Sequence, residues 1–329
     1  MIQYLYLGRV PYDEGLRLQA EIAALRLAGR IPNILLLLEH PPVLTLGRNA
    51  KRANVLASDA LLAARGVTLH EINRGGDVTY HGPGQLVGYP IFDLRSLHGP
   101  RGGRMGPVDF VRAMEEALIR LCAQFTVPAG RIQGLTGVWC NSEAVSKGHD
   151  FSRAIGGTKE MRTLAAEGCS SKFSPETDPL SIASGTDSEP PAITAGPARK
   201  IAAIGIHVSR GITSHGFAFN LTTNLRDFDL IVPCGIRDHA VTSLEREISP
   251  SQPLPSLEQL AHLAALQFGA VFDEPVAALA SFASLRTQAL HTQALHTQAQ
   301  QQFPAEDTPL QVPPEIERLH SNAERPIQA

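Results

Sequence analysis

The sequence lacks the features that mark several specialised classes of protein. Aromatic residues make up only 5% of the 329 residues, and the net charge is -3, so no basic field suited to nucleic acid or to a membrane surface is implied. No stretch approaches the roughly 18 unbroken apolar residues of a membrane-spanning helix. The opening MIQYLYLGRVPYDEG lacks the basic start and apolar run of a secretion signal. We therefore expect a cytoplasmic globular protein that binds neither nucleic acid nor membranes.

Cysteine is also scarce, and its spacing excludes the commonest structural uses of the residue. The four cysteines, Cys122, Cys140, Cys169 and Cys234, lie far apart and form no C-x-x-C pair. A chain of this length does not need disulfide bonds to hold its core together. Each thiol is therefore expected to be reduced and, by default, to be a small buried apolar group. A chemical role for any of them has to come from its surroundings.

The hydrophobic periodicity predicts an α/β or α+β fold. Apolar residues three and four positions apart mark helices, and Ser256 precedes the clearest of them. Continuous or alternating apolar runs predict strands in NILLLLEH, VLTLG, LVGYPI, KIAAIGIHV and HGFAFNL. Helix starts are expected at Asp13, Ser58, Pro107, Thr242 and Ser256, where a capping residue or a proline stands before the periodic segment.

Two stretches interrupt this pattern and define the expected domain organisation. Residues 141–198 are rich in Ser, Thr, Gly, Pro and Glu, so they can bury little apolar surface and are predicted to form a low-complexity insertion. From residue 285 the repeat LRTQA-LHTQA-LHTQA has a period of five, which matches neither a helix nor a strand. We therefore expect one globular domain over 1–282, interrupted at about 141–198, followed by a disordered tail over 283–329.

The densest motif is the glycine-rich segment RGGDVTYHGPGQ, which starts at Arg74. Glycines allow positive φ angles and close backbone approach, so successive N–H groups can converge on an anion or an oxyanion. A surface hairpin would also explain the glycines. Arg74, Tyr80 and His81 favour a binding cradle, because a loop tip does not need a cation, an aromatic ring and a titratable ring together. His81 and His215 could orient reacting groups or bind zinc, although no H-x-x-x-H pattern supports zinc.

Two further residues are candidates for chemistry. Lys200 begins the strand KIAAIGIHV, where a lysine is usually solvated. Cys234 lies in the segment PCG after an apolar run, at a predicted strand-to-helix turn. Backbone dipoles and a nearby cation can stabilise a thiolate at such a turn, although a buried and inert cysteine remains the alternative.

Three segments in order, RGGDVTYHGPGQLVGYPI, KIAAIGIHVSRGITSHGFAFNLTTNL and IVPCGI, resemble the lipoyl(octanoyl) transferases that make protein-bound lipoate. The resemblance implies a biotin/lipoate protein ligase-like α/β fold, with a mixed β-sheet flanked by helices. It implies that Cys234 forms an acyl thioester and that Lys200 activates this cysteine. It also implies a substrate-binding site made of Arg74, Gly75, Gly76, Asp77, Val78, Thr79, Tyr80, His81, Ala203, Ile204, Gly205, Gly216, Phe217 and Ala218.

The same resemblance implies a ping-pong reaction without a cofactor or metal. The donor would be octanoyl-acyl carrier protein, and the acceptors would be lysines of the lipoyl domains of 2-oxoacid dehydrogenase complexes and of the glycine cleavage H protein. Three other functions stay open: an ATP-using lipoate ligase, a non-catalytic binder of carrier or lipoyl domains, and a Cys-His hydrolase. Lys200 and Cys234 together favour the transferase, because a pure binder needs neither residue.

Overall fold

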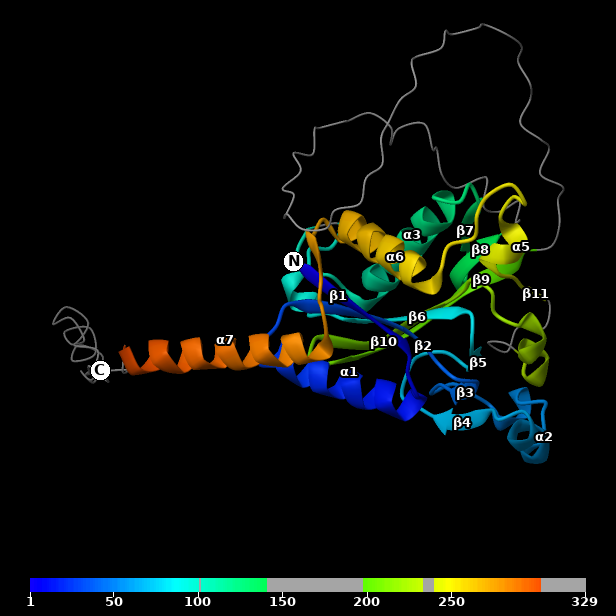
Figure 1. Ribbon diagram of the computed structural model, residues 1–329, viewed down its shortest axis with the longest axis horizontal. Helices are drawn as coiled ribbons and strands as arrows, with labels where there is room; N and C mark the ends of the chain where they lie inside the picture. The colour runs from blue at the N-terminus through cyan, green and yellow to red at the C-terminus, as the bar shows by residue number, and fades with distance from the viewer. Residues whose placement is uncertain (101, 141–197, 233–239, 303–329) are drawn as a thin grey trace, which may run out of the picture.

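The computed structural model describes residues 1–100, 102–140, 198–232 and 240–302. A large mixed sheet runs through this part of the protein (Figure 1). Its strands β1 and β12, β1 and β2, and β9 and β11 pair in parallel, and the others pair antiparallel. The strand order is β12 (Val276–Ala278), β1 (Ile2–Arg9), β2 (Asn33–Glu39), β6 (Gln85–Ile91), β10 (Ile212–Asn220), β9 (Arg199–Ser209), β8 (Leu135–Cys140) and β7 (Ala129–Ile132), with β11 (Ala240–Val241) beside β9.

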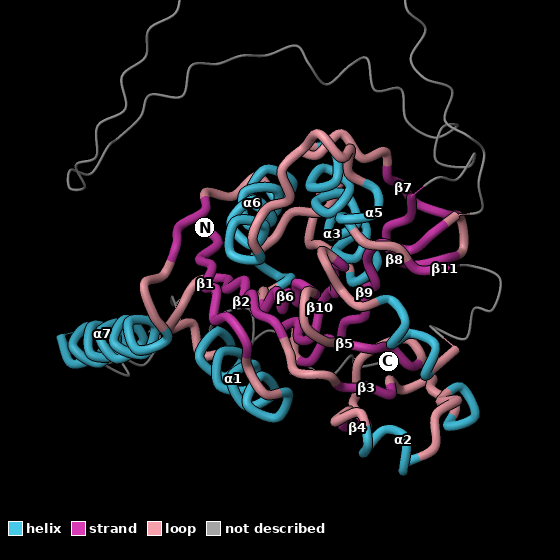
Figure 2. The backbone as a smooth tube through the Cα atoms, turned by 45° about the vertical axis from the view of Figure 1, so that its right-hand side comes forward, coloured by secondary structure: helices cyan, strands magenta, loops and turns pink. Residues whose placement is uncertain are grey.

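A second, three-stranded sheet lies at one end of the large sheet, together with the short helix α2 (Figures 1 and 2). Ser58 caps α2 as expected, because its hydroxyl accepts a bond of 3.2 Å from the N–H of Leu61. The elements of this small unit are β4 (Thr68–Glu71), β3 (Val43–Leu46), β5 (Val78–His81), α2 (Asp59–Ala64) and the 3-10 turn η1 (Arg52–Asn54).

Helices cover both faces of the large sheet, which explains the apolar run NILLLLE in β2 (Figure 1). Leu35 and Leu37 belong to the core beneath α3 (Pro107–Ala123) and α6 (Leu257–Phe272), whereas Leu36 belongs to the core on the opposite face. A strand buried on both faces needs apolar residues at every position. The opposite face is covered by α1 (Tyr12–Leu27) and α7 (Phe282–Gln302), and the shorter elements are η2 (Leu94–Ser96), η4 (Leu225–Leu230) and α5 (Leu244–Glu247).

The expected helix starts are partly correct. The capping box of Ser256 is confirmed, with Gln259 as its second member. Asp13 lies inside the first turn of α1, which begins after Pro11. Thr242 caps no helix, because its hydroxyl donates to Glu247 at 2.5 Å and Ser243 is the N-cap of α5, which starts at Leu244.

The period-five repeat is helical in α7, contrary to the expectation that it has no regular structure. Leu285 and Ala289, four positions apart, are buried in the core shared with α1. This i, i+4 pair lies on one face of the helix and packs its first turns against the core. Residues 141–197 and 303–329 lie outside the described residues, so the predicted insertion and the rest of the tail stay predictions. None of the described helices is long and apolar enough to cross a membrane.

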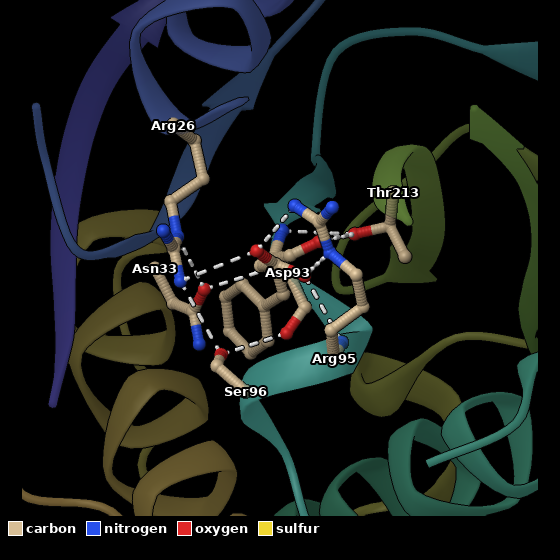
Figure 3. A network of polar contacts seen from close by, with 7 residues as sticks. Arg26, Asn33, Asp93, Arg95, Ser96 and Thr213 are labelled. Carbon is tan, nitrogen blue, oxygen red and sulfur yellow. Dashed lines mark hydrogen bonds and ion pairs between the residues drawn. The ribbon is translucent and has the colours of Figure 1, made fainter. Parts of the chain in front are cut away.

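A polar network fastens the end of α1 to two strands of the large sheet (Figure 3). The side-chain oxygen of Asn33 accepts from Arg26 at 2.9 Å and from the N–H of Asp93 at 2.9 Å. The Asp93 carboxylate accepts two bonds of 2.8 Å from Arg95. These bonds from Arg95 hold the pKa of Asp93 below its usual value. The network therefore fixes β2 and the residues after β6 relative to α1.

Candidate active site

A cavity of about 200 Å³ lies between the small sheet and the strands β6, β9 and β10 of the large sheet. Two sequence motifs that are far apart along the chain meet there, the glycine-rich segment that starts at Arg74 and the segment that starts at Lys200. The expected site residues that line it are Arg74, Gly76, Asp77, Thr79, His81, Lys200, Ala203, Ile204, Gly205, Gly216, Phe217 and Ala218.

Strand β5 shows why only some residues of the glycine-rich motif reach the cavity. Successive side chains of a strand point to opposite faces. Thr79 and His81 line the cavity, whereas Val78 and Tyr80 belong to the core of the small sheet. The Tyr80 hydroxyl donates to Asp227 at 2.9 Å, so this tyrosine supports the cavity wall from behind.

The loop from Arg74 to Asp77 is held tightly against β9. The N–H of Gly75 donates to the carbonyl of Ile206 at 2.9 Å, and Gly75 does not line the cavity. The buried Arg74 guanidinium donates to the carbonyl of Thr45 at 2.7 Å. Gly205 permits this packing, because a Cβ there would lie 2.6 Å from the carbonyl oxygen of Gly75.

Strands β9 and β10 supply an apolar wall. Ile204 and Phe217 are paired across the two strands, and both line the cavity with Val87 of β6. Gly216 keeps β10 close to β6, since a Cβ there would lie 2.1 Å from the carbonyl oxygen of Gly88. A wall of this kind can enclose a hydrocarbon chain.

Strand β9 contributes a cation, Lys200, to the lining of the cavity. Its side chain is buried, and its Nζ lies 4.5 Å from the centroid of the Trp139 ring on the neighbouring strand β8. A cation over an indole face is stabilised by the quadrupole of the ring. Gly137 lets β8 lie close to β9, because a Cβ there would lie 2.6 Å from the carbonyl oxygen of Ala202.

Cys234, the expected nucleophile, lies outside the described residues. The described chain stops at Val232, whose N–H donates to the carbonyl of Asn54 at 2.7 Å. It resumes at Ala240, and the next residue, Val241, is the parallel partner of Lys200. The residues that follow the undescribed segment 233–239 therefore lie next to β9, the strand that carries Lys200.

A group of rings closes another side of the cavity. Tyr12 of α1 packs against His40 and His70, each with 5.0 Å between ring centroids, and stacks on His81 at 6.3 Å. His40 Nε2 lies 2.7 Å from the hydroxyl of Tyr89. Burial lowers the pKa of His40 to about 4 and the pKa of His81 to about 3, so both rings are neutral near pH 7.

His215 is a further buried histidine with a lowered pKa, and its backbone conformation is strained. Its φ is +56°, which is rare for a residue with a side chain. Its Nε2 lies 2.8 Å from the side-chain oxygen of Asn73, and its N–H donates to Gln19 at 2.8 Å. Burial, followed by the nearby Arg74, lowers the pKa of His215 to about 4.

Sequence reasoning missed several lining residues. Tyr12 belongs to α1, whose amphipathic pattern explains it as a core residue, and Tyr89 lies in an apolar strand that gives no polar signal. The turn between β7 and β8 contributes Gly134, Leu135 and Thr136 to the lining. No motif marks this turn, and only the pairing of β8 with β9 brings it to the cavity.

Comparison with known proteins agrees with this geometry. The lipoyl protein ligase A/B catalytic domain family matches residues 11–268. An octanoyltransferase from Acidobacterium capsulatum is 51% identical over 278 residues, covering 84% of this chain and 92% of that protein. An octanoyltransferase from Koribacter versatilis is 42% identical over 322 residues, covering 98% of each chain.

Solved structures confirm the expected fold. A bipartite lipoate protein ligase from Thermoplasma acidophilum matches with a TM-score of 0.52 and 13% identity, over 88% of this chain and 91% of that chain. The mixed sheet flanked by helices is therefore the lipoate-protein-ligase type of α/β fold that the motifs predicted.

Proposed function

The chain belongs to the lipoyl protein ligase A/B catalytic domain family, and we propose that within it the chain is an octanoyltransferase of protein lipoylation. The observation that carries this proposal is the cavity that combines one buried lysine, Lys200, with an apolar wall. The wall suits an eight-carbon acyl chain. Identity of 51% over 92% of a curated octanoyltransferase supports the same activity.

In the proposed first half-reaction, the Cys234 thiolate attacks the carbonyl carbon of octanoyl-acyl carrier protein. A carbon–sulfur bond to Cys234 forms, the bond to the carrier sulfur breaks, and the carrier sulfur leaves as a thiol with a proton taken from the Lys200 ammonium, which becomes neutral. Lys200 stabilises the Cys234 thiolate by its charge. Support for this pairing of Cys234 with Lys200 comes from the residues that follow the undescribed segment 233–239, because Val241 pairs directly with Lys200 in the sheet.

In the second half-reaction, the amine of a lipoyl-domain lysine attacks the octanoyl-enzyme. The amide bond forms, the bond to Cys234 breaks, and one proton of the amine passes to the neutral Lys200, which restores the pair of ammonium and thiolate. Neutral His81 lines the same cavity and can accept a hydrogen bond from the incoming amine. The acceptors are lipoyl domains of 2-oxoacid dehydrogenase complexes and of the glycine cleavage H protein.

Backbone N–H groups are proposed to hold the oxyanion that forms in both steps. Gly75 is unsuited, since its N–H already donates to the carbonyl of Ile206. Gly76 lines the cavity with a φ of +90°, which leaves it as the candidate within the described loop. Gly235, the other candidate, lies outside the described residues.

Intact mass spectrometry tests the proposal. The protein is mixed with octanoyl-acyl carrier protein in the absence of ATP, and we expect one octanoyl adduct that a lipoyl domain then discharges. Cys234→Ala should abolish the adduct, and Cys140→Ala, which removes a buried thiol of β8, should retain it. If no adduct forms until ATP and free octanoate are supplied, the protein is a ligase and the proposal is wrong.

A further inference from the structure

Residues 48–65, which include η1 and α2, present an exposed surface with both positive charge and apolar side chains. Leu56 is 60% exposed and Leu61 is 41% exposed. Exposed leucines surrounded by charged residues are typical of a protein–protein contact surface. We call this surface the cationic rim, and its members are Arg48, Lys51, Arg52, Leu56, Leu61 and Arg65, all of them exposed.

The cationic rim is bonded directly to the loop that lines the cavity. The N–H of Arg48 donates to the carbonyl of Arg74 at 3.0 Å, and the N–H of Asn49 donates to the carbonyl of Gly76 at 3.2 Å. The N–H of Lys51 donates to the carboxylate of Asp77 at 3.4 Å. Since Arg74, Gly76 and Asp77 all line the cavity, the rim begins at its edge.

The charge of the rim is only partly neutralised by its neighbours. Asp59 pairs with Arg52 at 2.5 Å. Asp227 pairs more distantly with Arg65, at 3.8 Å. Within the described residues, no carboxylate forms an ion pair with the side chain of Arg48 or Lys51. The rim therefore has a positive surplus nearest the cavity, which attracts a partner with acidic residues.

We propose that the cationic rim is the docking surface for an acidic face of the acceptor lipoyl domain. This inference rests on the proposed function, which requires an acceptor lysine to enter the cavity. A lysine side chain has only a four-carbon stem. The acceptor domain must therefore contact the protein at the edge of the cavity, where the rim lies, whereas a donor that carries its acyl group on a long prosthetic arm can bind farther away.

Charge reversal with separated half-reactions tests the inference. In the double variant Arg48→Glu, Lys51→Glu, we expect the KM for the lipoyl domain to rise about tenfold and to lose most of its dependence on salt. The single-turnover rate of octanoyl-enzyme formation from octanoyl-acyl carrier protein should stay unchanged. Arg104→Glu, which reverses an exposed cation outside the rim, is the matched control and should change neither quantity.

Three outcomes would overturn the inference. An unchanged KM for the lipoyl domain would show that the rim does not contact it. Slower formation of the octanoyl-enzyme with a normal acceptor KM would assign the rim to the donor. Titration calorimetry of the lipoyl domain against the wild-type protein and the double variant measures docking without catalysis, and equal affinities would also contradict the inference. If wild type forms no octanoyl-enzyme, the proposed function fails, and calorimetry still decides the role of the rim.

Discussion

At the scale of single residues, Gln85 determines which nitrogen of His81 carries the proton. The amide nitrogen of Gln85 donates to Asn220 at 2.9 Å and to the carbonyl of Tyr80 at 3.2 Å, so its oxygen is left to accept from His81 Nδ1 at 2.8 Å. In a neutral imidazole the other nitrogen then has a free lone pair. Nε2 of His81 is therefore free to accept a hydrogen bond, and His81 lines the same cavity as Lys200.

Gln85→Glu tests this role of Gln85. A carboxylate at this position favours the charged imidazolium, so we expect the pKa of His81 to rise from about 3 and the ring to lose its acceptor at the lower end of the working pH range. The measurements are an NMR titration of the His81 ring and the pH dependence of kcat. An acid limb of the pH profile that does not move would contradict the role given to His81.

The buried histidines also predict how stability depends on pH. Burial lowers the pKa values of His40, His81 and His215 to about 4, 3 and 4, below the ordinary value of 6.5. Below about pH 6.5 the unfolded chain therefore binds more protons than the folded protein, and stability is lost as pH falls towards 4. Each histidine contributes a slope of at most about 1.4 kcal/mol per pH unit. Urea denaturation between pH 7.5 and 5 measures this slope, which should be shallower in His40→Gln.

At the scale of elements, the sequence predicted the strands and the glycine-rich loop better than it predicted which residues line the cavity. The alternation in β5 could have separated Thr79 from Tyr80, but the cavity face of that strand depends on its partner β3. Tyr12 could not be found, because a tyrosine on an amphipathic helix is usually a core residue. The repeat in α7 was misjudged because its period hides one buried i, i+4 pair, Leu285 and Ala289.

Glu115 of α3 holds the hairpin of β7 and β8 in place. This fully buried carboxylate accepts from the N–H of Gly137 at 3.0 Å, from Arg131 at 3.1 Å and from Arg112 at 2.6 Å. Glu115→Ala should lower the free energy of unfolding by about 2–4 kcal/mol, because it leaves the buried N–H of Gly137 without its acceptor and removes the bonds to Arg112 and Arg131. The turn that lines the cavity should loosen and kcat/KM should fall.

The neighbouring Glu116 is the control for this prediction. Its side chain is 24% exposed, and Glu116→Ala should cost less than about 1 kcal/mol. Chemical denaturation and kcat/KM measured on both variants check the difference. Equal losses of stability would show that burial of the carboxylate is unimportant.

The attachment of α7 gives a second prediction at this scale. Leu285 is fully buried, whereas Leu290 is 66% exposed. Leu285→Ala should lower the free energy of unfolding by about 2–4 kcal/mol through the lost burial and the cavity left behind. Leu290→Ala should change it by less than about 0.5 kcal/mol. Thermal denaturation monitored by circular dichroism distinguishes the two, and similar effects would contradict the packing of α7.

At the scale of the whole molecule, the cavity depends on segments that are far apart in the chain. Residues from α1, β5, the β7–β8 turn, β9 and β10 all line it. No single segment retains the site when the sheets separate, so we expect activity and helical circular dichroism to be lost together in urea. Coincident transitions are the signature of one cooperative unit. Loss of activity at clearly lower urea would show that the small sheet unfolds first.

The packing of Lys200 over Trp139 has a practical consequence. Trp139 is the only tryptophan in the chain, so the tryptophan fluorescence of the protein reports on the surroundings of Lys200. The emission of an indole responds to a charge placed on its face. The protein therefore contains its own optical reporter, through which arrival of an acyl chain and return of the empty enzyme can be followed by stopped flow without an added label.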